Sequence, residues 1–319
     1  MADKALFQDL KVFSGNAHPA LAGAICDYLE LPLGECEVFE FSNENIFVRF
    51  CENIRARDVF LIQPIAHPVN TRLMELFIMI DAAKRASAGR ITAVVPYYAY
   101  GRSDKKDQPR VPITARLIAN FLEAAGADRM LTIDLHAGQI QGFFNIQTDE
   151  LTALSILADY FKKQRDNRVV VAPDLGAAKR ARNFAQMLNA PLAVMEKRRL
   201  GNDEHAEIMH VIGEVKGMRA LVVDDEIDTA GTLVETMKAL LEAGVSEVTA
   251  CATHAVLSGP AVQRIEEAAI GELVVTDTLP LPPEKRLPKI TVLSVAPLLG
   301  EAIQRIHTGQ SVGALFDGV

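Results

Sequence analysis

The chain has 319 residues, of which 49% are hydrophobic and 23% charged, and its formal net charge is −8. This length predicts two domains, and the mixed composition excludes a disordered or low-complexity chain. The acidic balance argues against a dedicated nucleic-acid or membrane binder, and no apolar run reaches the roughly 18 residues of a membrane span. Four scattered cysteines, without metal-binding spacing, predict reduced thiols in a cytoplasmic protein.

Short apolar runs alternate with helical patterns along the whole chain. Most runs are apolar on both faces, which favours parallel strands covered by helices on each side. In chain order, we expect strands at residues 12–13, 36–41, 59–63, 91–97, 130–135, 169–172, 192–196, 220–223, 248–253, 273–276 and 290–295. Helices are expected from Pro112 to a cap at Gly126 and from Thr232 to Gly244. The alternation predicts an α/β fold of two doubly wound parallel-sheet domains that meet near residue 152.

The most informative segment follows the expected strand at 220–223. Asp224 and Asp225 come directly after the strand, a small-residue loop follows, and a helix begins near Thr232. Backbone N–H groups at a helix N-terminus bind anions, and a carboxylate pair can hold sugar hydroxyls. The segment therefore predicts a sugar-phosphate site. The alternative is an ordinary strand-to-helix turn with a capping threonine and exposed acids.

Residues 220–232 resemble the phosphoribosyl-binding loop shared by phosphoribosyltransferases and ribose-phosphate diphosphokinases. The resemblance implies that Asp224 and Asp225 hold the ribose hydroxyls of ribose 5-phosphate. It also implies that the following residues hold the 5-phosphate: Asp228, Thr229, Ala230, Gly231 and Thr232. The loop alone does not choose between an enzyme that makes phosphoribosyl diphosphate and one that consumes it.

Three further segments, at 132–144, 171–180 and 195–199, resemble the main ATP-dependent class of ribose-phosphate diphosphokinases. The resemblance implies that His136 and Asp174 bind Mg²⁺. It also implies that Lys197 and Arg199 stabilise the transition state and open a flexible loop running to about His210. Taken alone, these residues would be a structural loop histidine, a helix-capping aspartate and a solvated charge run.

The chain contains neither a Walker-type phosphate loop nor a dinucleotide-binding glycine motif. By resemblance, ATP binds the segments 41–45 and 97–107 together with the catalytic His136. The implied ATP contacts are Phe41, Asn43, Asn45, Arg102, Ser103, Asp107 and His136. Two of these positions depart from the family pattern, because Asn45 replaces a usual glutamate and Ser103 a usual glutamine. A nucleotide donor other than ATP therefore stays open.

The resemblance is collinear over nearly the whole chain. It implies transfer of the diphosphoryl group of MgATP to ribose 5-phosphate by a homohexamer built from dimers, with part of each nucleotide site supplied by a second chain. It also implies an N-terminal domain at 1–152, joined by 300–319, that carries the nucleotide site and oligomer contacts. The ribose 5-phosphate site belongs to a domain at 153–299.

Two rival functions and the regulation stay open. The rivals are a phosphoribosyltransferase, which would need neither the His136 segment nor the Lys197–Arg199 pair, and a non-catalytic regulatory partner of the same fold. Residues 308–316 resemble part of a regulatory site for phosphate or ADP. Arg55 and Arg110 match that site, whereas Asn53 and Asn145 replace a usual serine and aspartate.

Overall fold

The computed structural model of the protein describes residues 8–164, 167–199 and 207–316. The chain divides into two compact units. Unit 1 holds the described residues up to Thr152, together with Thr278–Pro280 and the stretch from Ser294 onward. Unit 2 holds Ala153–Asp277 and Leu281–Leu293. In the part of the chain that is described, no helix is both long and apolar enough to cross a membrane.

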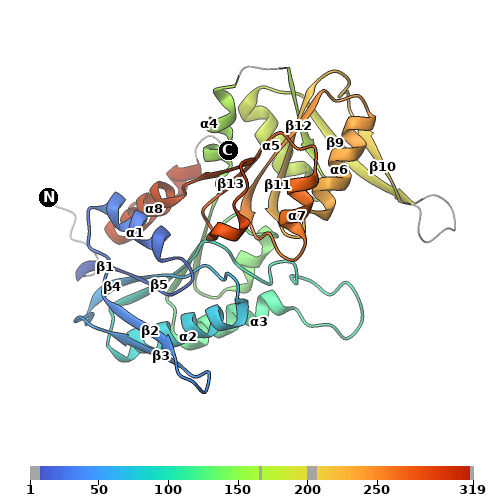
Figure 1. Ribbon diagram of the computed structural model, residues 1–319. Helices are drawn as coiled ribbons and strands as arrows, with labels where there is room; N and C mark the ends of the chain where they lie inside the picture. Colours follow the sequence, from blue (N-terminus) through green and yellow to red (C-terminus); the bar gives the residue numbers. More distant parts are fainter. Residues whose placement is uncertain (1–7, 165–166, 200–206, 317–319) are drawn as a thin grey trace. The chain divides into compact units, whose positions relative to one another are not determined.

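Unit 1 is built on a five-stranded parallel sheet with the order β1-β4-β5-β6-β7 (Figure 1). Its strands are β1 Gln8–Ser14, β4 Arg57–Ile62, β5 Arg90–Val95, β6 Arg129–Ile133 and β7 Gln147–Leu151. Its helical segments are α1 Pro19–Leu29, α2 Val69–Arg85, α3 Thr114–Ala125, α8 Ala296–Thr308 and the short 3₁₀ segments η1 Gly138–Phe143 and η3 Gly313–Phe316. Helix α1 packs against α8, and α2 packs against α3. Helix α3 starts at Thr114, two residues after the expected Pro112, and the expected cap at Gly126 is confirmed, with a left-handed φ of 117°.

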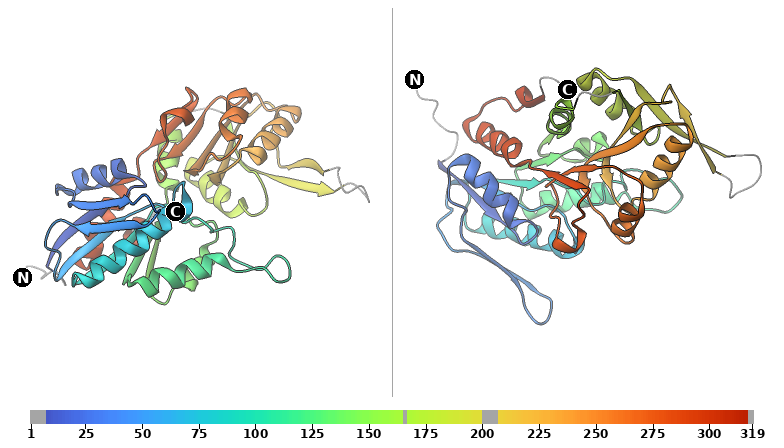
Figure 2. Two further views of the ribbon diagram at one scale, coloured as in Figure 1. Left: turned by 60° about the horizontal axis from the view of Figure 1, so that its bottom comes forward. Right: turned by 45° about the horizontal axis from the view of Figure 1, so that its top comes forward.

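A two-stranded antiparallel sheet extends from unit 1, as Figure 1 and the right view of Figure 2 show. It consists of β2 Cys36–Glu40 and β3 Ile46–Phe50, and β3 packs on α2. The expected strand at 36–41 therefore exists, but it pairs with β3 and not with the parallel sheet. The partner β3 was not predicted, although most of its residues are apolar, because so short a run also fits a loop or part of a helix.

Unit 2 is built on a seven-stranded sheet with the order β10-β9-β8-β11-β12-β13-β14. Its strands are β8 Arg168–Ala172, β9 Leu192–Arg199, β10 Glu207–Ile212, β11 Arg219–Ile227, β12 Glu247–Ala255, β13 Leu273–Thr276 and β14 Ile290–Leu293. Only β10 is antiparallel, and it pairs with β9 at the edge. The helical segments are α4 Leu154–Lys162, α5 Ala178–Leu188, α6 Gly231–Glu242, α7 Ala261–Glu267 and the 3₁₀ turn η2 Pro283–Lys285.

Alternating residues of the central strands of unit 2 pack on opposite faces of the sheet. Val170 and Leu221 belong to the cluster under α4 and α5, whereas Val169 and Val222 belong to the cluster under α6 and α7. A strand that is buried on both faces reads as a continuous apolar run, which is the pattern the sequence showed. The α/β fold with parallel sheets is therefore confirmed.

The order of strands reverses in unit 2 between β8 and β11. From β8 the chain continues to β9 on one side, and from β11 it continues to β12 on the other side. Loops that leave two such strands go to opposite faces of the sheet, which leaves an open crevice at their carboxyl ends. Both Asp174 and the loop after Ile227 follow these two strands.

A buried ion network ties helix α8 to the sheet of unit 1. The carboxylate of Asp58 in β4 is fully buried and accepts hydrogen bonds from Arg90 Nε at 2.8 Å and Arg90 Nη2 at 2.5 Å. His307 Nδ1 lies 2.8 Å from Asp58 Oδ2, and Arg90 Nη2 also donates to Ile306 O at 3.0 Å. Burial opposes ionisation of Asp58, but the bonds from His307 and Arg90 outweigh it and hold its pKa below the usual value.

Asp58→Asn is expected to loosen α8, because it leaves the Arg90 guanidinium buried without its anionic partner. Removing one member of a buried pair costs about 3–5 kcal/mol. Hydrogen–deuterium exchange over residues 296–308 should speed up at neutral pH. A lowered pKa means that the ionised carboxylate stabilises the fold above its unfolded pKa of about 3.9, so the difference from the wild type should vanish in acid.

Asp81→Asn is the matched control, since the Arg85–Asp81 pair on α2 is exposed and such pairs contribute little. Unchanged exchange in α8 after Asp58→Asn would show that the network does not anchor this helix.

Candidate functional site

The two acidic residues of the predicted sugar site lie inside strand β11, which runs on to Ile227. The sequence placed them just after the strand, so the strand continues four residues beyond its expected end. Asp225 is 9% exposed and Asp224 is partly buried. The backbone N–H of Asp225 donates to Asp224 Oδ1 at 2.9 Å. The pair therefore sits at the carboxyl end of a central strand, next to the loop.

Burial raises the pKa of Asp224 well above its ordinary value. A side-chain hydrogen bond with Asp225 and the negative charge of Asp225 raise this pKa further, and the charge of Asp174 adds a smaller effect in the same direction. Three carboxylates thus act on one another at the carboxyl ends of β8 and β11. Such an anionic group favours a cation or a set of hydroxyl donors at this edge of the sheet.

The loop between β11 and α6 is held through its carbonyl groups. Three consecutive carbonyls each accept a hydrogen bond from the segment after β12. The bonds run from Leu257 N to Ile227 O at 3.0 Å, from Ser258 N to Asp228 O at 3.0 Å, and from Arg264 Nη1 to Thr229 O at 3.0 Å. The Ser258 hydroxyl also donates to the Asp228 carboxylate.

Ala230 has a φ of 59°, a left-handed conformation that a residue with a side chain rarely adopts. Helix α6 begins at the next residue, Gly231, one position before the expected Thr232. A left-handed residue followed by a right-handed one turns successive N–H groups toward the same side, and such a concave arrangement binds anions. The first N–H groups of α6 have no partner within the helix and add to it.

Asp174 follows β8 by two residues and is exposed. Its Oδ1 accepts a hydrogen bond from Ala177 N at 2.9 Å, just before α5 begins. Helix capping was the alternative to Mg²⁺ binding for Asp174. The capping contact uses one carboxylate oxygen. Both interpretations can hold together, because the second oxygen can bind another group.

In unit 1, the segment containing His136 leaves the end of β6. Asp134 has a φ of 41°, and its carboxylate accepts a hydrogen bond from Thr152 Oγ1 at 2.8 Å. Leu135 N donates to Glu150 Oε1 at 2.8 Å. These contacts fix the turn, and His136 is exposed beyond it.

The loop before α3 lies beside the His136 segment. A Cβ added to Gly101 would come within 3.4 Å of His136 Cβ, and Gln139 Nε2 donates to the Asp104 carboxylate. Arg102, next to Gly101, is exposed. The structure thus brings Arg102 and His136, two predicted nucleotide contacts, to neighbouring loops of unit 1.

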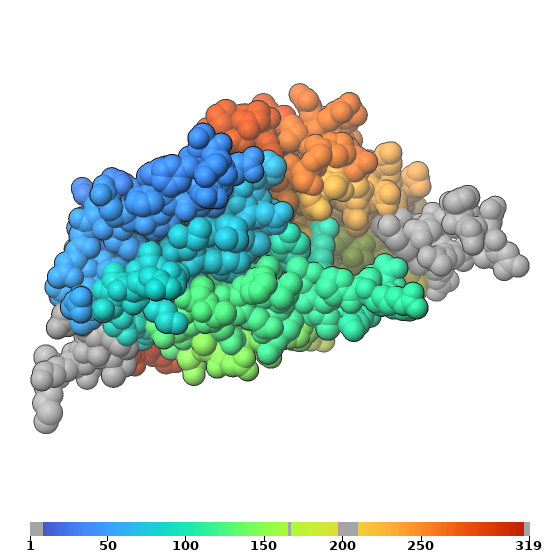
Figure 3. All heavy atoms as spheres, turned by 90° about the horizontal axis from the view of Figure 1, so that it is seen from below, coloured from blue at the N-terminus to red at the C-terminus, as the bar shows by residue number. Residues whose placement is uncertain are grey.

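Ser103 has a structural role that the sequence did not reveal. Its Oγ accepts a hydrogen bond from Thr114 N at 3.2 Å, and its carbonyl accepts one from Ala115 N at 3.1 Å, so it caps the start of α3. Asp107 is exposed in the loop between Ser103 and α3, and Figure 3 shows this loop standing out from the surface of unit 1.

The remaining predicted nucleotide contacts form the tip of the β2–β3 hairpin. Phe41 is 48% exposed, and its ring packs edge-on against Phe39 at 5.0 Å. Asn43 Oδ1 accepts from Asn45 N at 3.3 Å within the same turn. The hairpin tip and the loop before α3 extend from unit 1 at separate places in each ribbon view (Figures 1 and 2).

Lys197 and Arg199 occupy β9, opposite Met209 and Glu207 of β10. The expected flexible loop to about His210 is wrong in its extent, because both of its ends form an antiparallel strand pair. Backbone hydrogen bonding across the pair extends the strands beyond the apolar run. The side chains of Lys197 and Arg199, and the remaining residues 200–206, lie outside the described part of the chain. Across the described residues, no group of three metal-ligating side chains is found.

The chain resembles known proteins over most of its length. Residues 10–126 match the family model for the N-terminal domain of ribose phosphate pyrophosphokinase, and residues 202–317 match that of the phosphoribosyl synthetase-associated domain. A curated ribose-phosphate pyrophosphokinase of Caldanaerobacter subterraneus is 56% identical over 309 residues, covering 96% of this chain and 98% of that protein. One of Clostridium acetobutylicum is 50% identical over 312 residues, covering 97% and 98%.

A crystal structure of phosphoribosylpyrophosphate synthetase from Mycobacterium smegmatis superposes with a TM-score of 0.89 at 43% identity. It covers 94% of this chain and 99% of that one. The fold, the order of elements and the sequence therefore agree with the same group of proteins.

The raised pKa of Asp224 yields a prediction about stability. A carboxyl group whose pKa is raised by folding destabilises the folded state as pH rises through that pKa. Asp224→Asn is therefore expected to raise the melting temperature at neutral pH in metal-free buffer by a few degrees. The gain should disappear in acid, where the wild-type group is protonated. Thermal unfolding followed by calorimetry across pH measures both effects.

Asp159→Asn, an exposed change in α4, is the control and should leave the melting temperature unchanged. A lower melting temperature for Asp224→Asn at neutral pH would mean that the Asp224 carboxylate is stabilising.

Proposed function

We propose a residue-by-residue assignment of the reaction for this chain, which belongs to the ribose-phosphate pyrophosphokinase family. The protein forms phosphoribosyl diphosphate from ATP and ribose 5-phosphate. In this reaction the 1-hydroxyl oxygen of the sugar attacks the β-phosphorus of ATP, the bond from that phosphorus to the α-bridging oxygen breaks, and AMP leaves.

Ribose 5-phosphate binds at the carboxyl end of β11 in this proposal. The observation that carries it is that a carboxylate pair, the partly buried Asp224 and the buried Asp225, lies next to a loop whose carbonyls are already hydrogen-bonded. The N–H groups from Asp228 to Thr232 hold the 5-phosphate. The two carboxylates accept hydrogen bonds from the ribose hydroxyls. These donors also reduce the repulsion between the two carboxylates.

ATP binds unit 1 through two separate sets of residues. Arg102, Asp107 and His136 lie on the neighbouring loops after β5 and β6, and Ser103 combines nucleotide contact with the capping of α3. Phe41, Asn43 and Asn45 lie on the hairpin tip, apart from these loops in the ribbon views. This separation supports the arrangement that the family resemblance implies, in which one nucleotide contacts two chains.

We accordingly propose a homohexamer built from dimers, in which the hairpin tip of one chain completes the nucleotide site of its neighbour. The exposed rings of Phe39 and Phe41 on that tip suit stacking on a base or burial against a second chain. We also propose a cytoplasmic location, which the scattered cysteines of the sequence predict.

Asp174 and His136 are the proposed Mg²⁺ ligands. Asp174 suits this role, because it is exposed, its second carboxylate oxygen does not accept the Ala177 bond, and its charge acts on Asp224. Magnesium prefers such hard oxygen donors and keeps several waters. When bound, the ion neutralises charge on the phosphate oxygens. Lys197 and Arg199 stabilise the charge that develops as the β-phosphorus is transferred.

Lys197→Ala and Arg199→Ala are each expected to lower kcat by about 10²–10³-fold, because they remove positive charge that acts on the transition state. KM for ribose 5-phosphate should stay nearly unchanged. Steady-state kinetics measures this split. Arg198→Ala, between them in β9, is the control; if it lowers kcat equally, the assignment to alternate residues fails.

The reaction itself is tested by phosphorus NMR with ribose 5-phosphate, Mg²⁺ and one nucleotide at a time. AMP and a new diphosphate signal on carbon 1 of the sugar are expected with ATP. Turnover with GTP or CTP but not ATP would show that Asn45 and Ser103 change the donor. No turnover with any donor would contradict the assigned activity.

A further inference from the structure

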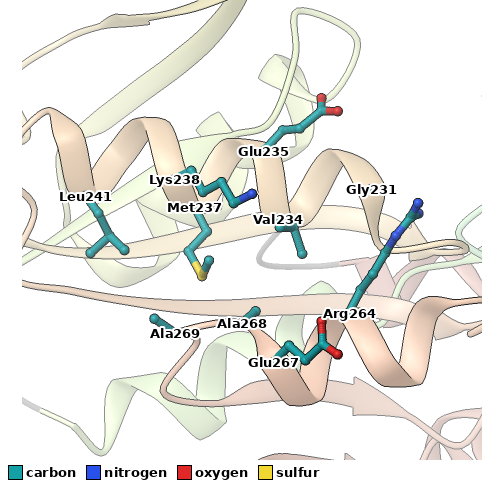
Figure 4. A pocket seen from close by; sticks show the side chains of 10 residues that line it. All are labelled: Gly231, Val234, Glu235, Met237, Lys238, Leu241, Arg264, Glu267, Ala268 and Ala269. Atoms are coloured by element: carbon teal, nitrogen blue, oxygen red, sulfur yellow. The ribbon is translucent and has the colours of Figure 1, made fainter.

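The three carbonyl contacts of the loop in unit 2 differ in kind. Those to Ile227 and Asp228 come from backbone N–H groups, which almost any residue can supply. The third comes from a side chain, the Arg264 guanidinium on α7, which donates to Thr229 O at 3.0 Å. Figure 4 shows this side chain reaching from α7 toward the first turn of α6, where Gly231 lies.

This contact fixes the direction of a neighbouring N–H group. In a trans peptide the carbonyl of Thr229 and the N–H of Ala230 belong to one plane and point in opposite directions. Because Arg264 holds the carbonyl on its own side, the Ala230 N–H is directed away from Arg264. If this peptide rotated, the carbonyl oxygen would point where the N–H had been, and its partial negative charge would repel an anion.

The backbone at this peptide needs external support. Ala230 is left-handed, a conformation that is unfavourable for an L-residue because its Cβ approaches the following carbonyl oxygen. Gly231 lies directly beside the guanidinium, since a Cβ there would make van der Waals contact with Arg264 Nη1 at 3.4 Å. Ala230 thus connects the Thr229 carbonyl that Arg264 holds to the first residue of α6, Gly231.

We propose that Arg264 is a positioning residue for ribose 5-phosphate. It holds the Thr229–Ala230 peptide in the orientation that presents the Ala230 N–H to the 5-phosphate, without reaching the substrate itself. The proposal rests on the assignment of residues 228–232 to the 5-phosphate and adds a residue from a different helix to that site.

The surroundings of Arg264 make it suitable for mutation. It is exposed beside an open pocket of about 610 Å³ between α6 and α7, which Glu235, Lys238 and Glu267 also line (Figure 4). Shortening a side chain at an open pocket leaves no sealed cavity in the core. A change in activity can therefore be separated from a loss of folding.

The test compares Arg264→Ala and Arg264→Lys with Gln263→Ala, the preceding exposed residue of α7. Losing a charged hydrogen-bond donor that orders the phosphate site should raise KM for ribose 5-phosphate about tenfold. We expect kcat and KM for ATP to stay within about twofold of the wild type, since the nucleotide is bound elsewhere. Arg264→Lys should recover most of the loss, because an ammonium group can donate to the same carbonyl.

The proposal is overturned if Arg264→Ala leaves KM for ribose 5-phosphate unchanged. It is also overturned if kcat and both KM values worsen together with a lower melting temperature, since that indicates a structural role. If Arg264→Ala does not fold, Arg264→Met keeps the aliphatic stem and carries the same test.

Gly231→Val separates this inference from the function on which it rests. It should raise KM for ribose 5-phosphate by crowding the loop. If it does so while Arg264→Ala has no effect, only the role of Arg264 is wrong. If Gly231→Val leaves KM for ribose 5-phosphate unchanged, the assignment of the loop to the 5-phosphate is wrong as well.

Discussion

Hydrogen bonding of the peptide carbonyls at the end of β11 is the constraint on which the candidate sugar-phosphate site depends. A loop that binds an anion must present N–H groups and turn its carbonyl oxygens away. Here the segment after β12 meets that requirement by donating to three consecutive carbonyls. The parallel pairing of β11 with β12 makes this possible, because it brings the two strand ends to the same edge of the sheet.

The same edge concentrates negative charge. Asp224, Asp225 and Asp174 act on one another across the ends of β8 and β11, and the raised pKa of Asp224 reflects the free energy needed to keep them ionised. A cation or a set of hydroxyl donors at this edge would lower that free energy, which supports the proposed binding site.

Most strands of the two parallel sheets could be predicted from the sequence. A parallel strand that is buried on both faces produces an apolar run, and such a run can be recognised without knowing which strands it pairs with. The run at 220–223 located β11, and the residues after it located the loop. Strand β7 lacks such a run, since it includes Asp149 and Glu150. Strand β10 is largely apolar, but most of it fell within the loop that the resemblance implied, and its pairing with β9 appears only in the structure. Pairing is a property of two segments, so neither segment reveals it alone.

The same reason explains which site residues the sequence missed. Ser258 and Arg264 lie about 30 residues beyond the loop that they hold, and no local pattern marks their contact with it. Ser103 was expected to contact the nucleotide. Its capping of α3 depends on a loop that returns to bring Thr114 N, eleven residues later, to Ser103 Oγ. Sequence patterns predict residues by their own chemistry, whereas contacts such as those of Ser258 and Arg264 with the loop became visible only in three dimensions.

The most direct measurement is a crystal structure of the protein with ribose 5-phosphate. We expect the 5-phosphate oxygens to lie within about 3 Å of the N–H groups of residues 228–232, and the Asp224 and Asp225 carboxylates to accept hydrogen bonds from the ribose hydroxyls. The Thr229 carbonyl should remain bonded to Arg264. A phosphate bound away from this loop, or a Thr229 carbonyl turned toward the phosphate, would contradict the proposed site.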